Sequence, residues 1–142
     1  MGSYIETHRN VVYPWHCDHQ NHMTTMHYVG MFDAAFWHLL SAAGFTRDYM
    51  EHHGTGFVDV RDTIEYRTEQ PVGSLIVIES GLTKIGNTSI TGFHCMRNGE
   101  SRDVAATSEK ITVYFDLNAR RKVPLPDDMR AAMDALLVER ED

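Results

Sequence analysis

A short run of polar, titratable residues precedes the most apolar segment of this chain. From Trp15 to Leu40 the sequence reads WHCDHQNHMTTMHYVGMFDAAFWHLL, with Asp18 four residues before His22. A carboxylate can attack a carbonyl carbon or take a proton from water, and a histidine or amide beside it can orient the reacting groups. Asp18, Asn21 and His22 are therefore candidates for nucleophilic or general-base chemistry.

The segment that follows is predicted to be a helix with one buried face. From Thr25 to Ala43 apolar residues recur at steps of three and four, the spacing of an amphipathic helix. Thr24 and Thr25 suit the start of this helix, and Gly44 suits its end. First-turn N–H groups lack acceptors within a helix and carry the positive end of its dipole. We therefore expect the amides near Thr25 to polarise a carbonyl held beside Asp18.

Alternating sequence patterns predict a sheet against this helix. Residues 8–15 predict a short strand, and residues 57–116 predict four strands with turns at 86–87 and 98–99. Residues 46–53 and 127–137 predict short helices. One long helix with a single apolar stripe needs a sheet to cover it, which indicates an α+β layer architecture. No repeat or linker interrupts the chain, so residues 1–142 are predicted to form a single domain.

The bulk composition narrows the possible partners. Hydrophobic residues make up 42% of the chain and charged residues 23%, which is typical of a globular protein. The formal net charge of −7 opposes binding to nucleic acid or to an anionic membrane. Cys17 and Cys95 form no CxxC pair, and no signal-like or membrane-spanning apolar run occurs. These features predict reduced thiols and a cytoplasmic protein.

The polar run and the helix together resemble a known family. The run DHQNHMTT from Asp18 to Thr25, then Tyr28, then FDAA from Phe32 is similar to the signature of hotdog-fold acyl-CoA thioesterases of the 4-hydroxybenzoyl-CoA thioesterase type. The segments EYRTEQPVGSLIVIESGLTKIGNTSI and ATSEKITVYFDLNARRKVPLP follow the family's order downstream. The Trp-x-x-Asp, His-Met-Thr and ATSE elements also resemble the thioesterases of carnitine and betaine catabolism, although Asn21 stands where those proteins carry glycine.

This resemblance implies an acyl-CoA thioesterase with the hotdog fold, with CoA as part of the substrate and no other cofactor. It implies that Asp18 is the nucleophile or general base and that an amide seven residues later, near Thr25, polarises the carbonyl. Both an anhydride intermediate and an activated water remain open. The histidines near Asp18 match no standard metal-ligand spacing, so no metal is predicted. The resemblance also implies a homodimer or homotetramer, with each active site between protomers.

Four further residues are candidates for substrate binding. Trp15 and Tyr28 could line an acyl pocket or hold a trimethylammonium headgroup through cation–π contact. Arg97 and Arg102 could meet the phosphate groups of CoA, which need basic partners. The resemblance implies that these CoA contacts come from the protomer opposite Asp18.

Two other functions remain open from the sequence. One is a hotdog dehydratase or hydratase that acts on a 3-hydroxyacyl or enoyl chain, and the other is a non-catalytic acyl-CoA-binding protein. The spacing Asp18-x-x-x-His22 favours the thioesterase, because the dehydratases typically place the histidine on a different segment. A binding protein would be expected to lack the loop acid.

Overall fold

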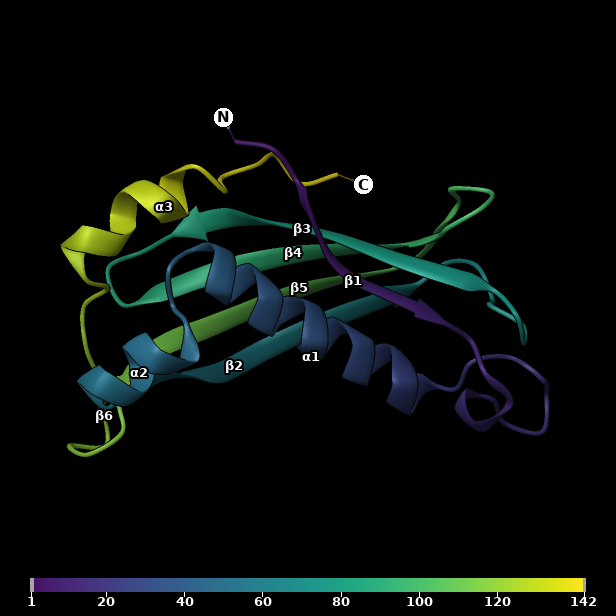
Figure 1. Ribbon diagram of the computed structural model, residues 1–142, viewed down its shortest axis with the longest axis horizontal. Helices are drawn as coiled ribbons and strands as arrows, with labels where there is room; N and C mark the ends of the chain where they lie inside the picture. The colour runs from purple at the N-terminus through teal and green to yellow at the C-terminus, as the bar shows by residue number, and fades with distance from the viewer. Residues whose placement is uncertain (1, 142) are drawn as a thin grey trace.

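A curled antiparallel sheet wraps one long helix in the computed structural model, which describes residues 2–141 (Figure 1). The observed order confirms the predicted α+β architecture. In chain order the elements are β1 (Ile5–Val11), η1 (Pro14–His16), α1 (Thr25–Ala42), α2 (Arg47–His53), β2 (Thr55–Tyr66), β3 (Leu75–Ile85), β4 (Ser89–Asn98), β5 (Val104–Asp116), β6 (Arg121–Lys122), η2 (Asp127–Met129) and α3 (Arg130–Asp134).

The sheet ends in a long strand with a free edge. Its order is β1-β3-β4-β5-β2, with β6 pairing to β5, and every named pair is antiparallel. β2 pairs with β5 from Thr55, opposite Asp116, to Tyr66, opposite Ala106. Within residues 2–141 no strand pairs with the other edge of β2. Unpaired N–H and C=O groups therefore line that edge.

The helix α1 forms where its apolar spacing predicts. Its buried residues recur at steps of three and four, and they include Phe32 and Leu39, neither of which is exposed. Burying a side chain of this size contributes about 1.5–3 kcal/mol. The helix ends at Ala42, and Gly44 adopts a φ of 96°, the left-handed conformation that glycine accepts at a helix end. The predicted helix is confirmed to within one residue.

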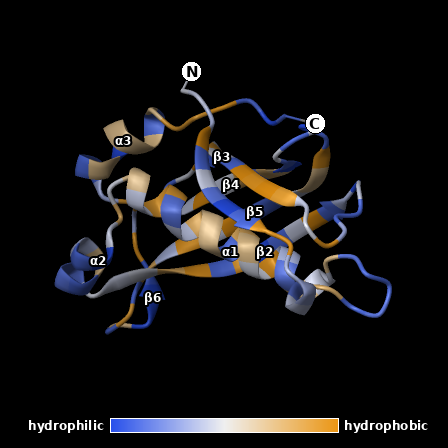
Figure 2. Ribbon diagram, turned by 45° about the vertical axis from the view of Figure 1, so that its right-hand side comes forward, coloured by the Kyte–Doolittle hydropathy of each residue, from blue (hydrophilic) through white to orange (hydrophobic). Residues whose placement is uncertain are grey.

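The core lies between α1 and the concave face of the sheet. One cluster of buried residues includes Phe36, Leu40 and Phe45, and a second includes Phe32 and Met96. In Figure 2 the hydrophobic residues concentrate on the strands beneath α1, whereas α2 is mostly hydrophilic. No helix within residues 2–141 is long and apolar enough to span a membrane.

Three buried polar side chains join β1, β3 and β4 under the helix. Thr7 Oγ1 lies 2.7 Å from Ser80 Oγ, which lies 2.6 Å from His94 Nδ1. Burial, and after it the nearby Lys110 ammonium, lower the pKa of His94 to about 3. His94 is therefore a neutral core residue at pH 7.

The predicted boundaries of the first strand and of the C-terminal helix are wrong. β1 begins at Ile5 rather than at residue 8, because pairing with β3 already starts opposite Ser80, and it ends at Val11 rather than at residue 15, because residues 14–16 form η1. The C-terminal helix ends at Asp134 rather than at residue 137. The chain leaves the helix because Leu82 N–H donates to Leu136 O at 2.8 Å and Val138 N–H donates to Leu82 O at 2.8 Å. The two-residue strand β6 was not predicted.

Candidate active site

The loop that carries Asp18 is a tight turn held by its own backbone. Asp18 N–H donates to His22 O at 3.3 Å, and Asn21 N–H donates to Asp18 O at 3.0 Å. Gln20 N–H donates to Asp18 Oδ1 at 2.9 Å. One carboxylate oxygen of Asp18 is thus fixed by the loop, a short-range bond typical of aspartate in turns.

Asn21 supports this turn through its backbone. Its φ of 68° lies in the left-handed region, which glycine adopts freely and asparagine tolerates better than most residues. Asparagine is therefore suited to the backbone conformation that this position of the loop requires. Asn21 is exposed and does not line the cleft described next, so the structure gives it a role in shaping the loop.

A cleft of about 370 Å³ lies between this loop, the start of α1 and the end of β2. Asp18, His22, Thr25 and Tyr28 line it, so the structure brings these four predicted site residues together. The side chain of Asp18 is exposed within the single chain. The cleft's other main residues come from the end of β2 and the connection that follows it: Tyr66, Arg67, Thr68 and Glu69.

The start of α1 leaves hydrogen-bond donors on this cleft. Thr24 precedes the helix with an extended backbone, and its side chain makes no capping hydrogen bond. No acidic residue lies in the first turn. His27 N–H donates to Thr24 O at 3.0 Å, whereas Thr25 N–H and Met26 N–H keep their donor capacity at the positive end of the helix dipole. These two N–H groups can stabilise negative charge that develops on a carbonyl oxygen.

Glu69 is a site residue that sequence reasoning missed. His22 Nε2 lies 3.3 Å from Glu69 Oε2, while His22 Nδ1 is buried without a hydrogen-bond partner among residues 2–141. Glu69 reaches the site because Met23 N–H donates to Gln70 O at 2.9 Å, which ties the β2–β3 connection to the loop. A contact between segments more than forty positions apart leaves no local signal in the sequence.

Tyr28 forms part of the cleft's wall beneath the polar groups. Its side chain is 5% exposed, and its ring lies edge-on to that of Tyr66 with centroids 5.1 Å apart. Burial, and to a smaller extent Tyr66 and Glu69, raise the pKa of Tyr28. Its phenol therefore stays protonated near neutral pH and can donate a hydrogen bond.

Trp15 lies outside the cleft. Its ring stacks on Tyr13 with centroids 4.6 Å apart, and 70% of the residue is exposed. It does not line the cavity around Asp18. Within one chain the Tyr13–Trp15 pair therefore lies on the protein surface and does not form a wall of the cleft.

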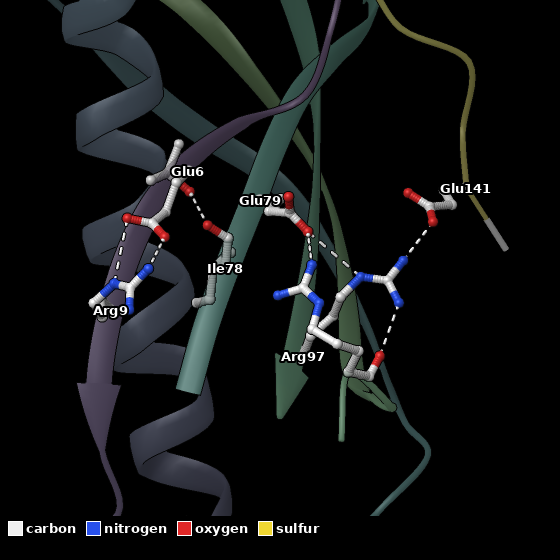
Figure 3. A network of polar contacts seen from close by, with 8 residues as sticks. Glu6, Arg9, Ile78, Glu79, Arg97 and Glu141 are labelled. Atoms are coloured by element: carbon white, nitrogen blue, oxygen red, sulfur yellow. Dashed lines mark hydrogen bonds and ion pairs between the residues drawn. The ribbon is translucent and has the colours of Figure 1, made fainter. Parts of the chain in front are cut away.

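Arg97 and Arg102 also lie away from Asp18, on the outer face of the sheet. Figure 3 shows Arg97 between Glu79 and Glu141. Its Nε lies 3.5 Å from Glu79 Oε1, its Nη2 bonds Glu141 Oε1, and Arg102 Nη2 lies 2.9 Å from Glu79. Both guanidinium groups are thus paired with carboxylates within the chain. The basic residue that does line the cleft is Arg67.

The histidines of this region form contacts without a metal-type cluster. The rings of His16 and His27 lie edge-on with centroids 4.9 Å apart. Across residues 2–141 no group of three histidine, cysteine, aspartate or glutamate side chains is arranged to hold a metal ion.

With this geometry defined, comparison with known proteins decides the family. A family model described as "Thioesterase-like superfamily" matches residues 12–133. This chain belongs to the thioesterase-like superfamily. The match spans the candidate loop, α1 and every strand of the sheet except β1, so the membership predicted from the loop and helix motifs is confirmed.

Two curated proteins are similar to this chain in sequence. The chain is 26% identical over 124 residues to an L-carnitine dehydrogenase/betainyl-CoA thioesterase of Agrobacterium fabrum, covering 87% of this chain. It spans about a quarter of the length of the curated relatives it matches.

Two solved structures share the architecture. A hypothetical protein from Staphylococcus aureus in complex with CoA has a TM-score of 0.88 and 16% identity, covering 99% of this chain and 90% of that one. A 1,4-dihydroxy-2-naphthoyl-CoA thioesterase from Synechocystis has a TM-score of 0.79 and 18% identity, covering 91% and 95%. The predicted hotdog fold is confirmed.

Proposed function

We propose that this thioesterase-like protein hydrolyses an acyl-CoA thioester to a free acid and CoA. The observation that carries the proposal is one cleft that is lined both by Asp18 and by the start of α1 at Thr24 and Thr25. Thioester hydrolysis needs a nucleophile or base and a group that stabilises the oxyanion. The superfamily membership and the thioesterase named in the curated relatives support this choice.

The reaction would proceed with the carbonyl between Asp18 and the helix. Asp18 either attacks the carbonyl carbon or takes a proton from the attacking water. The Thr25 amide donates to the carbonyl oxygen as negative charge develops there. The C–S bond then breaks, and the thiolate takes a proton to become the CoA thiol. His22, positioned by Glu69 at 3.3 Å, is placed to supply that proton. Where Asp18 has attacked directly, water then hydrolyses the resulting anhydride, which releases the acid and restores the Asp18 carboxylate.

We propose that Arg67, which was not predicted from the sequence, contacts CoA from the same chain as Asp18. Arg67 lines the cleft, 36% of its side chain is exposed, and its ion pair with Glu65 is long, with Nη2 3.8 Å from Glu65 Oε1. It can therefore meet a phosphate from within the chain. Arg97 and Arg102 are engaged with Glu79, and they would serve CoA only from another protomer. This placement is consistent with a homodimer or homotetramer in which the site lies between subunits.

The acyl group is a separate part of the proposal. The relatives in Agrobacterium fabrum and Rhizobium meliloti are named as betainyl-CoA thioesterases, so betainyl-CoA belongs in any substrate panel. A role in carnitine metabolism is a proposal that follows from the same resemblance. A cytoplasmic location stays a proposal from the two unpaired cysteines and the lack of a signal-like run in the sequence.

The test is thiol release from a panel of acyl-CoAs by the wild type and by Asp18→Asn. The substitution keeps the shape of the side chain and removes its charge, so kcat should fall at least about 100-fold. Asp103→Asn is the matched control, because Asp103 is exposed and does not line the cleft, and its kcat should be unchanged. Undiminished turnover by Asp18→Asn would contradict the assignment. Tight acyl-CoA binding without thiol release by the wild type would show a binding protein instead.

A further inference from the structure

A small pocket lined by histidines lies at the edge of the sheet opposite β2. It encloses about 200 Å³ between β1, η1 and the first half of α1, and its polar lining residues are His8, Asn10, His16 and His27. A larger, apolar cavity of about 850 Å³ lies at the end of α1, beside α2 and the start of β2. The histidine pocket shares no lining residue with that cavity or with the Asp18 cleft. It is therefore a separate candidate site.

The size of the histidine pocket suits a small ion. Pockets for drug-sized molecules usually span ~300–1,000 Å³, whereas one water molecule occupies ~30 Å³. A pocket of about 200 Å³ therefore has room for a tetrahedral oxyanion with a few water molecules, but not for a whole acyl-CoA.

A glycine inside α1 keeps this pocket open. Gly30 is exposed and lines the pocket. A Cβ added at Gly30 would meet nothing within 4 Å, apart from its chain neighbours and the helix backbone. Packing therefore does not require glycine at this position, although glycine inside a helix is less favourable than alanine. What the missing side chain provides here is open space beside the histidines.

Hydrogen-bond donors line the pocket. Val11 N–H donates to Asn10 Oδ1 at 2.8 Å, which leaves Asn10 Nδ2 3.2 Å from His8 Nε2. A neutral His8 then accepts at Nε2 and carries its proton on Nδ1. His16 Nδ1 accepts from Tyr13 N–H at 2.9 Å, so a neutral His16 carries its proton on Nε2. N–H donors of this kind suit a ligand that has only acceptors.

No carboxylate lines this pocket, although the whole chain carries a formal net charge of −7. On β1, Arg9 pairs with Glu6 at 2.5 Å and lines a different cavity. On α1, Asp33 lies 3.7 Å from Lys110 Nζ. The paired strand β3 contributes the uncharged Ile78 opposite this stretch of β1. Protonated rings in the pocket would therefore face one another without an anion.

These surroundings disfavour protonation of the rings. Burial, and after it His38 farther along α1, lower the pKa of His8. Burial, and after it His27, lower the pKa of His16, whereas a hydrogen bond with the Val11 backbone raises it. A bound anion would raise both pKa values, so its binding takes up protons and strengthens as the pH falls.

We propose that the histidine pocket binds a tetrahedral oxyanion, either as a free ion or as the phosphate group of a larger molecule. The N–H donors, the missing carboxylates and the open space at Gly30 support this class of ligand. The pocket is distinct from the Asp18 cleft, so anion binding does not depend on the proposed function.

Titration with sulfate tests the pocket, because sulfate stays a dianion between pH 5.5 and pH 7.5. Calorimetry should show binding at least about fivefold tighter at pH 5.5 than at pH 7.5, since binding takes up protons. In two-dimensional NMR spectra the largest amide shifts should centre on Gly30 and His27. Absence of binding, equal affinity at both pH values, or shifts centred on the Asp18 cleft would contradict the inference.

Filling the pocket separates specific binding from general attraction to a protonated surface. Gly30→Leu keeps every titratable group, adds a side chain to the open space, and should lower the affinity for sulfate at least about tenfold at pH 5.5. Thermal unfolding should show no loss of stability, because leucine favours a helix more than glycine does. Val29→Leu is the matched control, because Val29 is exposed and does not line the pocket, and its affinity should stay within about twofold. Unchanged affinity in Gly30→Leu would overturn the proposal.

Removing one ring tests the role of the histidines. His27→Gln should weaken sulfate binding at pH 5.5 at least about threefold and reduce its dependence on pH. His52→Gln is the control, because His52 is an exposed histidine of α2 that does not line the pocket. Wild-type affinity in His27→Gln would contradict a histidine-based site.

Competition with CoA identifies the source of the oxyanion. CoA that displaces sulfate from the wild type, together with a higher KM for acetyl-CoA in Gly30→Leu, would identify a phosphate group of CoA as the ligand. Sulfate binding that CoA leaves unchanged, with the same KM in both proteins, would identify a free ion. Either result supports the pocket as an oxyanion site.

Discussion

The two ends of α1 differ in the chemistry that they offer. At its start, uncapped N–H groups face a small polar cleft with Asp18 and His22. At its end, Ala43 N–H and Gly44 N–H bond back to the last turn and Phe45 is buried, so the neighbouring cavity is apolar. The polar end also carries the positive end of the peptide dipoles, which favours developing negative charge, whereas the side chains Trp37, Phe45 and Phe57 make the other end apolar. One helix thus borders a polar cleft at its start and an apolar cavity at its end.

Removing one N–H at the polar end gives the largest expected effect. Thr25 is the first residue of α1, where proline is well tolerated, and Thr24 before it is already extended, with φ −85° and ψ 156°. Thr25→Pro should therefore lower kcat about 100- to 1,000-fold, the usual loss for one oxyanion donor, with the fold retained. Thr25→Ala keeps the N–H and should retain most activity. Steady-state kinetics with a circular-dichroism check of folding decide the matter, and equal activity in both variants would remove the amide from the mechanism.

Acid should lower the free energy of unfolding through His94, which lies between the two ends of α1. His94 lies under the middle of α1, with its ring near Phe32 and Phe36. Its pKa is about 3 in the folded chain and near 6.5 when unfolded, so the unfolded state binds more protons between these values. This contribution to stability is complete above pH 6.5 and is lost as the pH falls, by about 2 kcal/mol at pH 5.

Urea unfolding of the wild type and His94→Gln at pH 7 and pH 5 measures this loss. The variant lacks the titrating ring, so the free energy of unfolding should fall by about 2 kcal/mol less than in the wild type over this interval. The same pH dependence in both proteins would show that other groups cause it.

Loosening the apolar end should have a moderate effect on stability. Thr46 Oγ1 accepts a hydrogen bond from Tyr49 N–H at 3.1 Å and caps α2, the helix that walls the apolar cavity. Thr46→Ala should cost about 1 kcal/mol in the free energy of unfolding. It should leave kcat with acetyl-CoA unchanged, because the polar end is untouched. Thermal unfolding and acetyl-CoA kinetics measured on one preparation test both statements, and a lower kcat would show that the two ends are coupled.

The smallest expected effect lies at the rim of the polar end. Glu69 is paired with His22, but 76% of its side chain is exposed, and exposed ion pairs contribute little. Glu69→Gln should lower kcat about threefold, because it removes the carboxylate that orients the His22 ring. Glu100→Gln, at an exposed turn, is the control. An unchanged kcat in Glu69→Gln would leave Glu69 without a role.

The sequence predicted the parts of the site that lie close together in the chain. The steps of three and four in α1 indicated its buried face, and the run ahead of it indicated where Asp18, His22 and the Thr25 amide meet. Both patterns are local, so no tertiary information was needed. The same is true of the glycine that ends the helix.

The parts that depend on distant contacts could not be predicted in this way. Glu69 and Arg67 reach the cleft through the pairing of the loop with the β2–β3 connection. The orientation of Arg97 could be predicted, because successive side chains of a strand point to opposite faces of the sheet. Met96 packs toward α1, so its neighbour in the strand must face away from the helix. The pairing of Arg97 with Glu141 still required the position of the C-terminal segment.

A double-mutant cycle of Asp18→Asn and Thr25→Pro tests most directly whether the carboxylate and the helix amide act on the same carbonyl. Each single change should lower kcat at least about 100-fold. If both groups serve one transition state, the double variant should be little slower than the slower single variant, because groups that act as a unit are not additive. A loss equal to the product of the two single effects, about 10,000-fold or more, would show independent roles and contradict the account.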